Sequence, residues 1–367
     1  MLSGLDLDRK KAVYLGMAGV TVLVMAFFLI YYSFLYEKTY TAYTLTEISK
    51  IRENSVESCD LDGKILRTSP DGAELCDSRM NSLVKLAFEM KRPETLVNDA
   101  FALVMDRGGR EALIIEADGT NAMLKTPGVI TGGAISGQGQ AAFLLEGRQS
   151  VYLVNMEGEE AEGPPLSSSK TALALCFAGT GKTLAVSELG LELGDPVSAI
   201  SFYNINGEPI KTGEMTYKGS LIPALFPLSG GRILALGDDC LSVIRADAAP
   251  KEIYAEKPEG KIRKAVSGGG RAALLIENEE RVCKVYVYDR GGKQSVLEPG
   301  FAVTEMALTG SRVLLYDLSN VFIATAGGKK QFEGKIYESE TIRSVVEVGR
   351  GSYRIGGEYG VDALSLR

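Results

Sequence analysis

Alternating hydrophobic and polar positions recur along the chain in short stretches, and each stretch ends in an acidic residue or an asparagine close to a glycine. Such alternation over four to eight residues is typical of a β-strand with one buried face. Asp-Gly and Asn-Gly pairs supply the positive φ that a two-residue hairpin requires. The pattern therefore predicts strand-turn units, and the four clearest cover residues 113–119, 151–158, 200–207 and 285–292.

These units repeat with a period of about 40 residues. Weaker copies end near Met80, Ala249 and Gly328, so that successive turns lie 36 to 49 residues apart. Stretches of small residues interrupted by glycine, such as 134–143 and 265–274, precede the units and predict an inner strand, a turn and a second strand. Four short strands per repeat of this length are typical of a β-propeller blade.

The two ends of the chain indicate how the ring closes. After the last turn, residues 341–348, 352–356 and 361–366 supply only three strands, whereas residues 41–51 alternate as a strand with no blade of its own. Pairing this strand with the last three completes a blade and leaves no exposed sheet edge. We therefore expect an all-β, eight-bladed propeller of four-stranded blades, with seven blades as the alternative.

The segment 12–36 contains no charged residue. A membrane-spanning helix needs about 20 apolar residues, whereas a signal peptide has an apolar region of about 7–15 residues. We therefore expect one transmembrane signal anchor, and the alternative is a buried helix of a soluble core. The chain then divides into a cytoplasmic tail (1–11), the anchor (12–36), a juxtamembrane segment with the ring-closing strand (37–55) and the propeller (56–367). The apolar side chains expected in the bilayer are Val13, Leu15, Val20, Val22, Leu23, Val24, Phe27, Phe28, Leu29 and Ile30.

Positive charges next to this segment predict its orientation. Arg9, Lys10 and Lys11 directly precede it, and only Lys38 lies close to its other end. Because Lys and Arg accumulate on the cytoplasmic side of membrane segments, we expect the N-terminus in the cytoplasm and the propeller outside the cell. The predicted location is the cell membrane, with a single pass.

The chain has no histidine and no tryptophan. Without imidazole it has no Ser-His-Asp or Cys-His nucleophile pair and no His ligand for a catalytic zinc or iron. Glycine accounts for 42 of 367 residues, about 11% against a typical ~7%, which favours many tight turns. The formal net charge is −7, and a nucleic-acid partner is not expected because the basic footprint of such proteins is missing. We also expect no cofactor.

Five cysteines are scattered along the chain: Cys59, Cys76, Cys176, Cys240 and Cys283. A small extracellular module held by disulfides has dense cysteines in even number. Most of the five are therefore expected to be small buried side chains. Cys59 and Cys76 are close enough in sequence to pair if their strands are neighbours, and the sequence leaves that alternative open.

The segment 177–183 (FAGTGKT) resembles a phosphate-binding loop. Cys176 stands where the motif has its first glycine. The motif also needs a helix whose N-terminus faces the phosphates, but a strand-like stretch follows and is expected to end in a turn at Gly190. The segment aligns with 136–140 and 267–271 of neighbouring repeats, so we expect a hairpin turn and no nucleotide partner.

Other candidate sites have structural explanations. Acidic clusters at 157–162, 238–239 and 277–280 lack the spacing of a calcium-binding loop and are expected to be solvated loops. The tyrosines of the repeated strands are expected to pack between blades and not to form a ligand cage: Tyr152, Tyr203, Tyr286 and Tyr288. No catalytic, cofactor-binding or metal-binding residue is therefore assigned.

The uncharged segment, residues 63–72 (GKILRTSPDG) and the strand-turn at 202–208 (FYNINGE) resemble an uncharacterised family of single-pass membrane proteins from Gram-positive, clostridial-type bacteria. The ectodomains of that family are similar to WD40 and quinoprotein-like propellers. The resemblance covers nearly the whole chain and implies no catalytic residues, because the family has no agreed function. The chain lacks the Gly-His and Trp-Asp signature of WD40 blades and the tryptophan docking motif of quinoproteins, which disfavours a quinone cofactor.

Two functions fit these features. The preferred one is a non-catalytic, membrane-tethered propeller that binds an envelope protein or polymer through loops at the ends of its channel. The alternative is an extracellular carbohydrate-active or lyase-type enzyme that uses carboxylates in the channel. Converging Asp, Glu, Arg and Tyr side chains in one deep pocket would favour catalysis, whereas Ser, Thr, Gly and Ala would favour binding.

Overall fold

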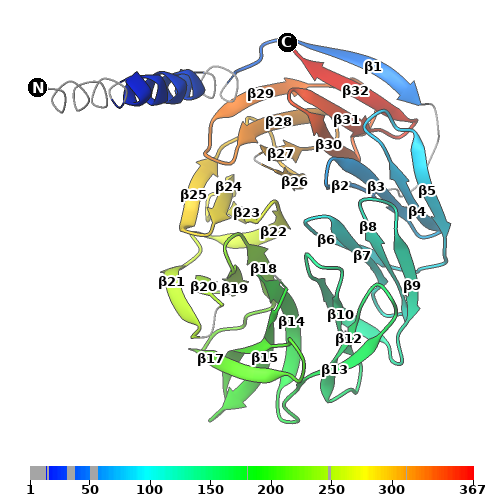
Figure 1. Cartoon of the computed structure of the whole chain (residues 1–367), viewed down its shortest axis with the longest axis vertical. Coiled ribbons are helices and arrows are strands. Elements are labelled where there is room, and N and C mark those ends of the chain that lie inside the picture. Colours follow the sequence, from blue (N-terminus) through cyan, green and yellow to red (C-terminus); the bar gives the residue numbers. More distant parts are fainter. Residues whose placement is uncertain are drawn as a thin grey trace, which may run out of the picture.

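The strands form a ring of eight antiparallel sheets with four strands each (Figure 1). The computed structural model describes residues 14, 16–30, 38–49, 57–179, 181–246, 249–310 and 312–367. Within these ranges, each sheet is one blade of a propeller, and the prediction of eight blades is confirmed over the alternative of seven.

The first four blades follow one another along the chain. Blade 1 consists of β2 (Glu57–Leu61), β3 (Lys64–Ser69), β4 (Gly72–Cys76) and β5 (Ser82–Ala87). Blade 2 consists of β6 (Pro93–Asn98), β7 (Phe101–Asp106), β8 (Glu111–Glu116) and β9 (Asn121–Lys125). Blade 3 consists of β10 (Ile130–Ile135), β11 (Ala141–Leu145), β12 (Ser150–Val154) and β13 (Glu160–Pro165). Blade 4 consists of β14 (Thr171–Ala178), β15 (Thr183–Glu192), β16 (Asp195–Asn204) and β17 (Ile210–Lys218).

The other four blades complete the ring. Blade 5 consists of β18 (Ala224–Leu228), β19 (Arg232–Leu236), β20 (Leu241–Arg245) and β21 (Lys251–Glu256). Blade 6 consists of β22 (Lys261–Gly268), β23 (Arg271–Glu277), β24 (Cys283–Asp289) and β25 (Gly292–Leu297). Blade 7 consists of β26 (Glu305–Thr309), β27 (Arg312–Tyr316), β28 (Asn320–Thr325) and β29 (Lys330–Lys335). Blade 8 consists of β30 (Ser344–Gly349), β31 (Ser352–Gly356), β32 (Val361–Leu366) and β1 (Tyr43–Ser49).

Blade 8 joins the two ends of the chain as predicted. β1 pairs antiparallel with β32, from Tyr43 opposite Leu366 to Ser49 opposite Val361. The Tyr43 hydroxyl also donates a hydrogen bond to the carbonyl oxygen of Lys335 in blade 7, at 2.8 Å. The first strand in the sequence therefore covers the outer edge of the last blade.

The predicted turns lie between the third and fourth strands of the blades. The backbone is left-handed at six of the predicted positions: Met80, Gly119, Gly158, Gly207, Gly292 and Gly328. At the seventh, near Ala249, residues 247–248 lie outside the described residues. The four clearest repeats supply the third strands β8, β12, β16 and β24. Local turn chemistry therefore marks the repeat correctly.

Apolar side chains fill the interfaces between neighbouring blades. Seven of the eight interfaces hold clusters of ten or more buried apolar residues. Tyr152 and Tyr203 lie in the clusters on either side of blade 3, and Tyr286 and Tyr288 lie between blades 5 and 6. The expectation that these tyrosines pack between blades is confirmed.

The segment that resembles a phosphate-binding loop is the hairpin turn between β14 and β15, as predicted. Gly179 and Gly181 have φ of 62° and 80°, and residue 180 lies outside the described residues. The prediction of a turn at Gly190 is wrong. Gly190 pairs with Val197 inside the hairpin, and the chain reverses three residues later, at Leu193 and Gly194.

All five cysteines are free. Cys59 on β2 and Cys76 on β4 are separated by β3, because Cys59 is opposite Leu66 and Cys76 is opposite Ile65. The two side chains also lie on opposite faces of the blade, since Cys59 packs towards blade 2 and Cys76 towards blade 8. Their strands are not neighbours, so the condition for a disulfide is not met.

Before β1, the described part of the chain contains a helix at residues 16–30. Within the described residues, no helix is long and apolar enough to cross a membrane. The structure therefore does not support the predicted transmembrane helix over 12–36. Val20, Val22, Leu23, Val24, Phe27, Phe28, Leu29 and Ile30 lie in the described helix and are exposed. The remaining predicted positions, Val13, Leu15, Arg9, Lys10 and Lys11, lie outside the described residues.

Strand direction gives the ring two different faces. Turns from first to second strands lie on the same face as turns from third to fourth strands, because neighbouring strands are antiparallel. β1 begins on this face, and the backbone N–H of Tyr40 donates to the carbonyl oxygen of Gln331 there, at 2.7 Å. We call it the proximal face. Turns from second to third strands and the connections between blades lie on the opposite, distal face.

Candidate functional site

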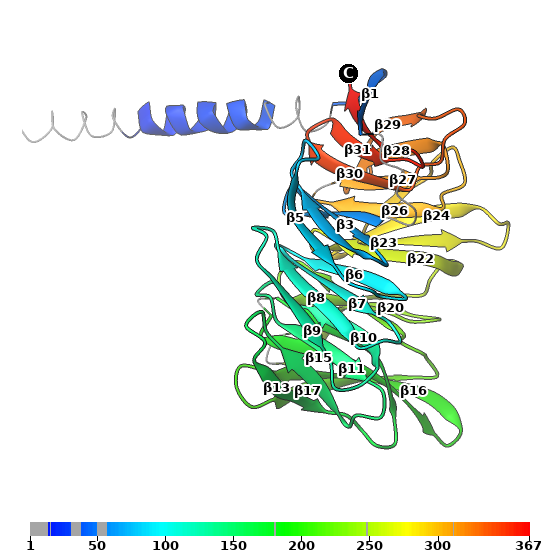
Figure 2. The same ribbon diagram turned by 90° about the vertical axis from the view of Figure 1, so that its right-hand side faces the viewer.

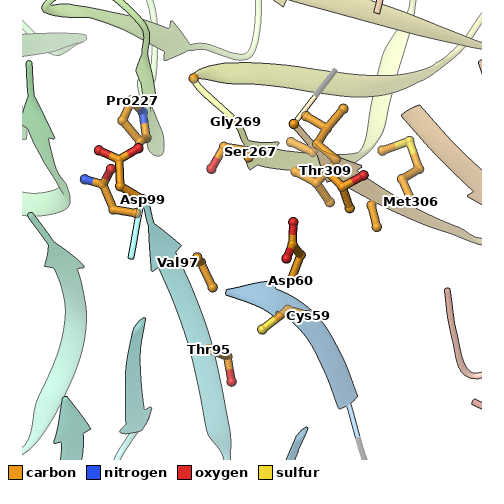
Figure 3. Close-up of a pocket in the computed structure, with 18 of the residues that line it drawn as sticks. Cys59, Asp60, Thr95, Val97, Asp99, Pro227, Ser267, Gly269, Met306 and Thr309 are labelled. Atoms are coloured by element: carbon orange, nitrogen blue, oxygen red, sulfur yellow. The ribbon is translucent and has the colours of Figure 1, made fainter. Parts of the chain in front are cut away.

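The innermost strands of the ring surround a central channel with a volume of about 1890 Å³. Among the described residues, those that line it come from every blade except blade 3. Figure 3 shows Asp60 near the end of β2 and Asp99 just beyond the end of β6, with Ser267 and Thr309 across the channel. A large concave site of this kind is the default candidate for a binding site.

Glycine turns crowd together at the proximal end of the channel. A Cβ atom on Gly179 would lie 3.1 Å from the Cα of Gly231, and one on Gly269 would lie 2.7 Å from the carbonyl oxygen of Gly310. All four glycines have positive φ, a conformation that costs other residues energy. Backbone atoms therefore form this end of the channel, and Gly179 of the phosphate-loop look-alike belongs to the same set of turns.

Acidic side chains outnumber basic ones along the described wall. The carboxylates are Glu57, Asp60, Asp62, Glu94, Asp99 and Glu305, and the basic side chains are Arg245, Lys264 and Arg343. Glu305 forms an ion pair with Lys264. Burial, together with the charges of Glu305 and Glu57, raises the pKa of Tyr316 near the distal end. A wall of this sign repels polyanions.

Asp60 is the channel carboxylate with the most distinct environment. Its Oδ1 accepts a hydrogen bond from the backbone N–H of Gly63 at 2.9 Å. Burial raises the pKa of Asp60, the Gly63 hydrogen bond opposes this, and the charge of Asp62 adds to the increase. In Figure 3 the carboxyl group points into the open channel. A carboxyl group of raised pKa in a cavity is a candidate for acid–base chemistry.

The rest of the wall offers little reactive chemistry. Gly, Ala, Ser and Thr make up about half of the lining residues. In the part of the chain that the structure describes, no group of three Cys, Asp or Glu side chains is arranged to hold a metal ion. Small side chains and backbone therefore form about half of the lining, beside the carboxylates and basic side chains named above.

The acidic clusters considered in the sequence have structural partners outside the channel. Asp239 accepts a hydrogen bond from the Ser220 hydroxyl at 2.6 Å, and Glu277 pairs with Arg263. Sequence reasoning missed Asp60, because residues 60–63 (DLDG) carry the signal of a hairpin turn. Only the curvature of the ring shows that this turn borders the channel.

Solved structures with a similar fold share little sequence with this chain. BamB from Moraxella catarrhalis has 12% identity and a TM-score of 0.52, over 88% of this chain and 100% of that one. Apo AztD from Citrobacter koseri has 12% identity and a TM-score of 0.51, over 77% and 86%. Virginiamycin B lyase from Staphylococcus aureus has 13% identity and a TM-score of 0.48, over 75% and 95%. At these identities, the two similarities with TM-scores above 0.5 show the β-propeller fold alone, since one fold hosts many functions.

Most of the chain also matches a family profile, although a comparison with curated proteins finds no match. The matched region, residues 36–365, runs from just before β1 to near the end of β32. It therefore includes all eight blades and the strand that closes the ring. This protein belongs to the Family of unknown function (DUF5711).

Proposed function

We propose that this protein is a non-catalytic β-propeller, tethered to the cell membrane, that binds an envelope protein or polymer outside the cell. The observation that carries the proposal is the channel itself. It has a volume of about 1890 Å³, and small side chains and backbone form much of its lining. Such a wall offers a ligand a defined shape and hydrogen-bonding groups from the backbone and from small side chains. Binding through the channel is therefore the activity that this site supports best.

The channel carboxylates are divided between its two ends. Glu57 and Glu94 lie within the first two residues of their inner strands, near the distal face, whereas Asp62 and Asp99 lie in turns at the proximal face. These carboxylates come from different ends of the channel. A pair for glycoside hydrolysis must lie within about 5–9.5 Å across one bond, so it would have to come from a single end of the channel.

Blocking the channel tests this function. We expect Ser267→Trp to fill part of the channel, because Ser267 lines it, while Ser169→Trp adds the same bulk on an exposed loop. Full-length wild type and both variants would be expressed in the native cells and crosslinked, and their neighbours quantified by mass spectrometry. The proposal expects a neighbour that Ser267→Trp loses and Ser169→Trp keeps. Identical neighbours for all three chains would contradict it.

Asp60 supports one alternative, an extracellular carbohydrate-active or lyase-type enzyme. A general acid in such enzymes is a carboxyl group of raised pKa, and Asp60 has that property inside the channel. Incubating the full chain and Asp60→Asn with isolated envelope polysaccharide separates the two functions. The enzyme would release products that Asp60→Asn does not. Equal product yields from both chains, at the level of buffer alone, favour the binding function.

The proposed tether rests on the chemistry of the N-terminal segment. Residues 16–30 carry no charge, and all of their side chains are exposed in the described helix. All of these residues except Thr21 are apolar. Exposing them to water is costly, and a bilayer removes that cost. The flanking Arg9, Lys10 and Lys11 favour a cytoplasmic N-terminus.

Membrane fractionation tests the tether. We expect the protein to stay in membranes during alkaline extraction, and protease added to intact cells to digest the propeller. Replacing Arg9, Lys10 and Lys11 with Glu should reduce the digested fraction, because the positive charges set orientation. Release by alkali, or a propeller that is protected in intact wild-type cells, would refute the tether.

A further inference from the structure

Blade 4 carries an extension that the other blades lack. β15 and β16 have ten residues each, whereas the second and third strands of the other blades have five to seven. The added residues continue the antiparallel ladder to Leu191 opposite Pro196 and Glu192 opposite Asp195. The turn joins a second strand to a third, so the hairpin projects from the distal face, at the lower right of Figure 2.

The base of this hairpin is held firmly. Ser198 is fully buried, and its hydroxyl donates to the carbonyl oxygen of Ser220 at 2.9 Å and accepts from the N–H of Ile222 at 3.0 Å. Nearer the tip, Glu192 forms an ion pair with Lys218 of β17 at 3.1 Å. The extension is therefore anchored at its base in the blade and ends in an exposed tip.

The tip of the hairpin carries exposed leucines, although neither its turn conformation nor burial favours an apolar side chain there. Leu193 has a φ of 54° and Gly194 a φ of 97°, the pattern of a turn that favours Asn-Gly or Asp-Gly. The chain uses aspartate at similar φ elsewhere, at Asp62 and Asp99. Leu193 is fully exposed and Leu191 is 75% exposed. Neither the turn nor any packing explains these leucines, and a strained, exposed residue of this kind points to function.

We propose that the tip of the β15–β16 hairpin is a docking element, which inserts Leu191 and Leu193 into an apolar pocket of a partner protein. The distal face is the one opposite the start of β1, so the tip points away from the N-terminal segment and its proposed membrane. Asp195 adds a negative charge next to the leucines, and Glu192 between them is paired with Lys218. The tip therefore keeps a net negative charge, which disfavours an anionic lipid surface and favours a neutral or basic pocket rim. Other exposed apolar side chains in turns of this face are Val282, Leu318 and Tyr359.

A photocrosslinking amino acid at position 191 of the full chain, in its native cells, tests the contact. The matched control position is Ile210, which is 65% exposed and lies in the same blade near the proximal face. We expect an adduct with one protein at 191 and not at 210, identified by mass spectrometry. Adducts with lipid, adducts with a second copy of this chain, or equal adducts at both positions would overturn the proposal.

Affinity for the identified protein, purified, gives the second readout. Leu193→Asn suits the turn, so it should leave the melting temperature equal or higher while weakening binding at least about tenfold, because a buried leucine is lost. Leu191→Ser should weaken binding similarly, and Ile210→Ser should leave it unchanged. Full affinity in Leu193→Asn would refute the docking role. The hairpin lies outside the channel, so this proposal and the channel proposal fail separately.

Discussion

At the scale of single residues, backbone conformation explains features that the sequence presents as chemistry. Gly181 and Lys182 both belong to the apparent phosphate-binding loop, but only the glycine has a structural role. Gly181 has a φ of 80°, and a Cβ atom there would lie 2.9 Å from the Cβ of Ser136 in blade 3. The Lys182 side chain is exposed. The motif is a turn that allows two blades to approach.

This difference predicts opposite results for neighbouring substitutions. Gly181→Ala should lower the free energy of unfolding by at least about 1 kcal/mol, because alanine is strained at this φ. Lys182→Ala should change it by less than about 0.5 kcal/mol, as for most exposed positions. Denaturant unfolding of the full chain measures both. Nucleotide binding by the wild type that disappears in Lys182→Ala would contradict the hairpin interpretation.

At the scale of elements, a polar cluster fastens blade 5 to blade 6. Glu256, at the end of β21, accepts hydrogen bonds from the hydroxyls of Tyr288 at 2.5 Å and Tyr254 at 2.6 Å, and it pairs with Lys293 at 2.9 Å. Tyr288 is completely buried. Burial alone would raise the pKa of Glu256, but the hydrogen bonds and the Lys293 charge outweigh it and lower that pKa. The cluster therefore stabilises the ring when Glu256 is ionised.

The lowered pKa predicts how stability depends on pH. Glu256→Gln should lower the free energy of unfolding by about 1.5–3 kcal/mol at pH 7, the range for hydrogen bonds to a charged group. A depressed folded-state pKa stabilises above the unfolded-state pKa, and the gain is lost as pH falls through the folded-state value. The difference in the free energy of unfolding between wild type and Glu256→Gln should therefore be constant near neutral pH and shrink below about pH 4.3.

A nearby glutamate supplies the control for this measurement. Glu259 accepts a hydrogen bond from Tyr286 at 2.8 Å, but its side chain is 63% exposed. Glu259→Gln should therefore cost less than Glu256→Gln. A gap for Glu256→Gln that is unchanged at pH 3 would argue against the ionised cluster as the source of the stability.

At the scale of the whole molecule, the eight interfaces of the ring are unequal. Between blades 8 and 1, the described residues supply only Ile65, Cys76 and Val346 as a buried apolar cluster. Polar groups occupy the same interface, since Arg354 on β31 donates to the carbonyl oxygen of Ser78 at 2.5 Å. Because apolar burial is the main source of stability between blades, this seam is the weakest in the described ring.

The weak seam predicts where the ring opens first. Among the inner strands, β2 and β30 should show the lowest protection in hydrogen exchange of the full chain. Opening of the interface between blades 8 and 1 exposes these two strands while the other interfaces remain closed. β26 of blade 7 is the internal comparison, since large clusters cover both of its sides. Protection of β2 and β30 equal to that of β26 would show that the ring opens cooperatively instead.

The parts of the fold that follow local rules could be predicted. Alternation and Asn-Gly or Asp-Gly turns act over a few residues, which is why the period, the closing strand at Tyr43–Ser49 and the turns at Gly119 and Gly292 agree with the structure. The turn of the β15–β16 hairpin was misplaced at Gly190. Leu193 gives no turn signal, and glycine is tolerated inside a paired strand.

For the candidate site, the sequence could predict a channel but not the individual residues that line it. The sequence indicated a ring with a lined channel, but it could not show that Asp60 borders the channel or that Glu305 pairs with Lys264. These residues lie in different blades, far apart in the chain. Their distances depend on the tilt and number of the blades, and no local pattern encodes either.

The sequence by itself determined the strands, the repeat and the way the ends meet, because hydrophobic alternation and turn chemistry are properties of neighbouring residues. Tertiary structure alone decided which carboxylates face the channel, which interface is weak and where Leu191 and Leu193 point. Those features arise where separate blades are brought together by burial of their apolar faces. Contact between distant parts of a chain is a property of the closed ring and not of any one repeat.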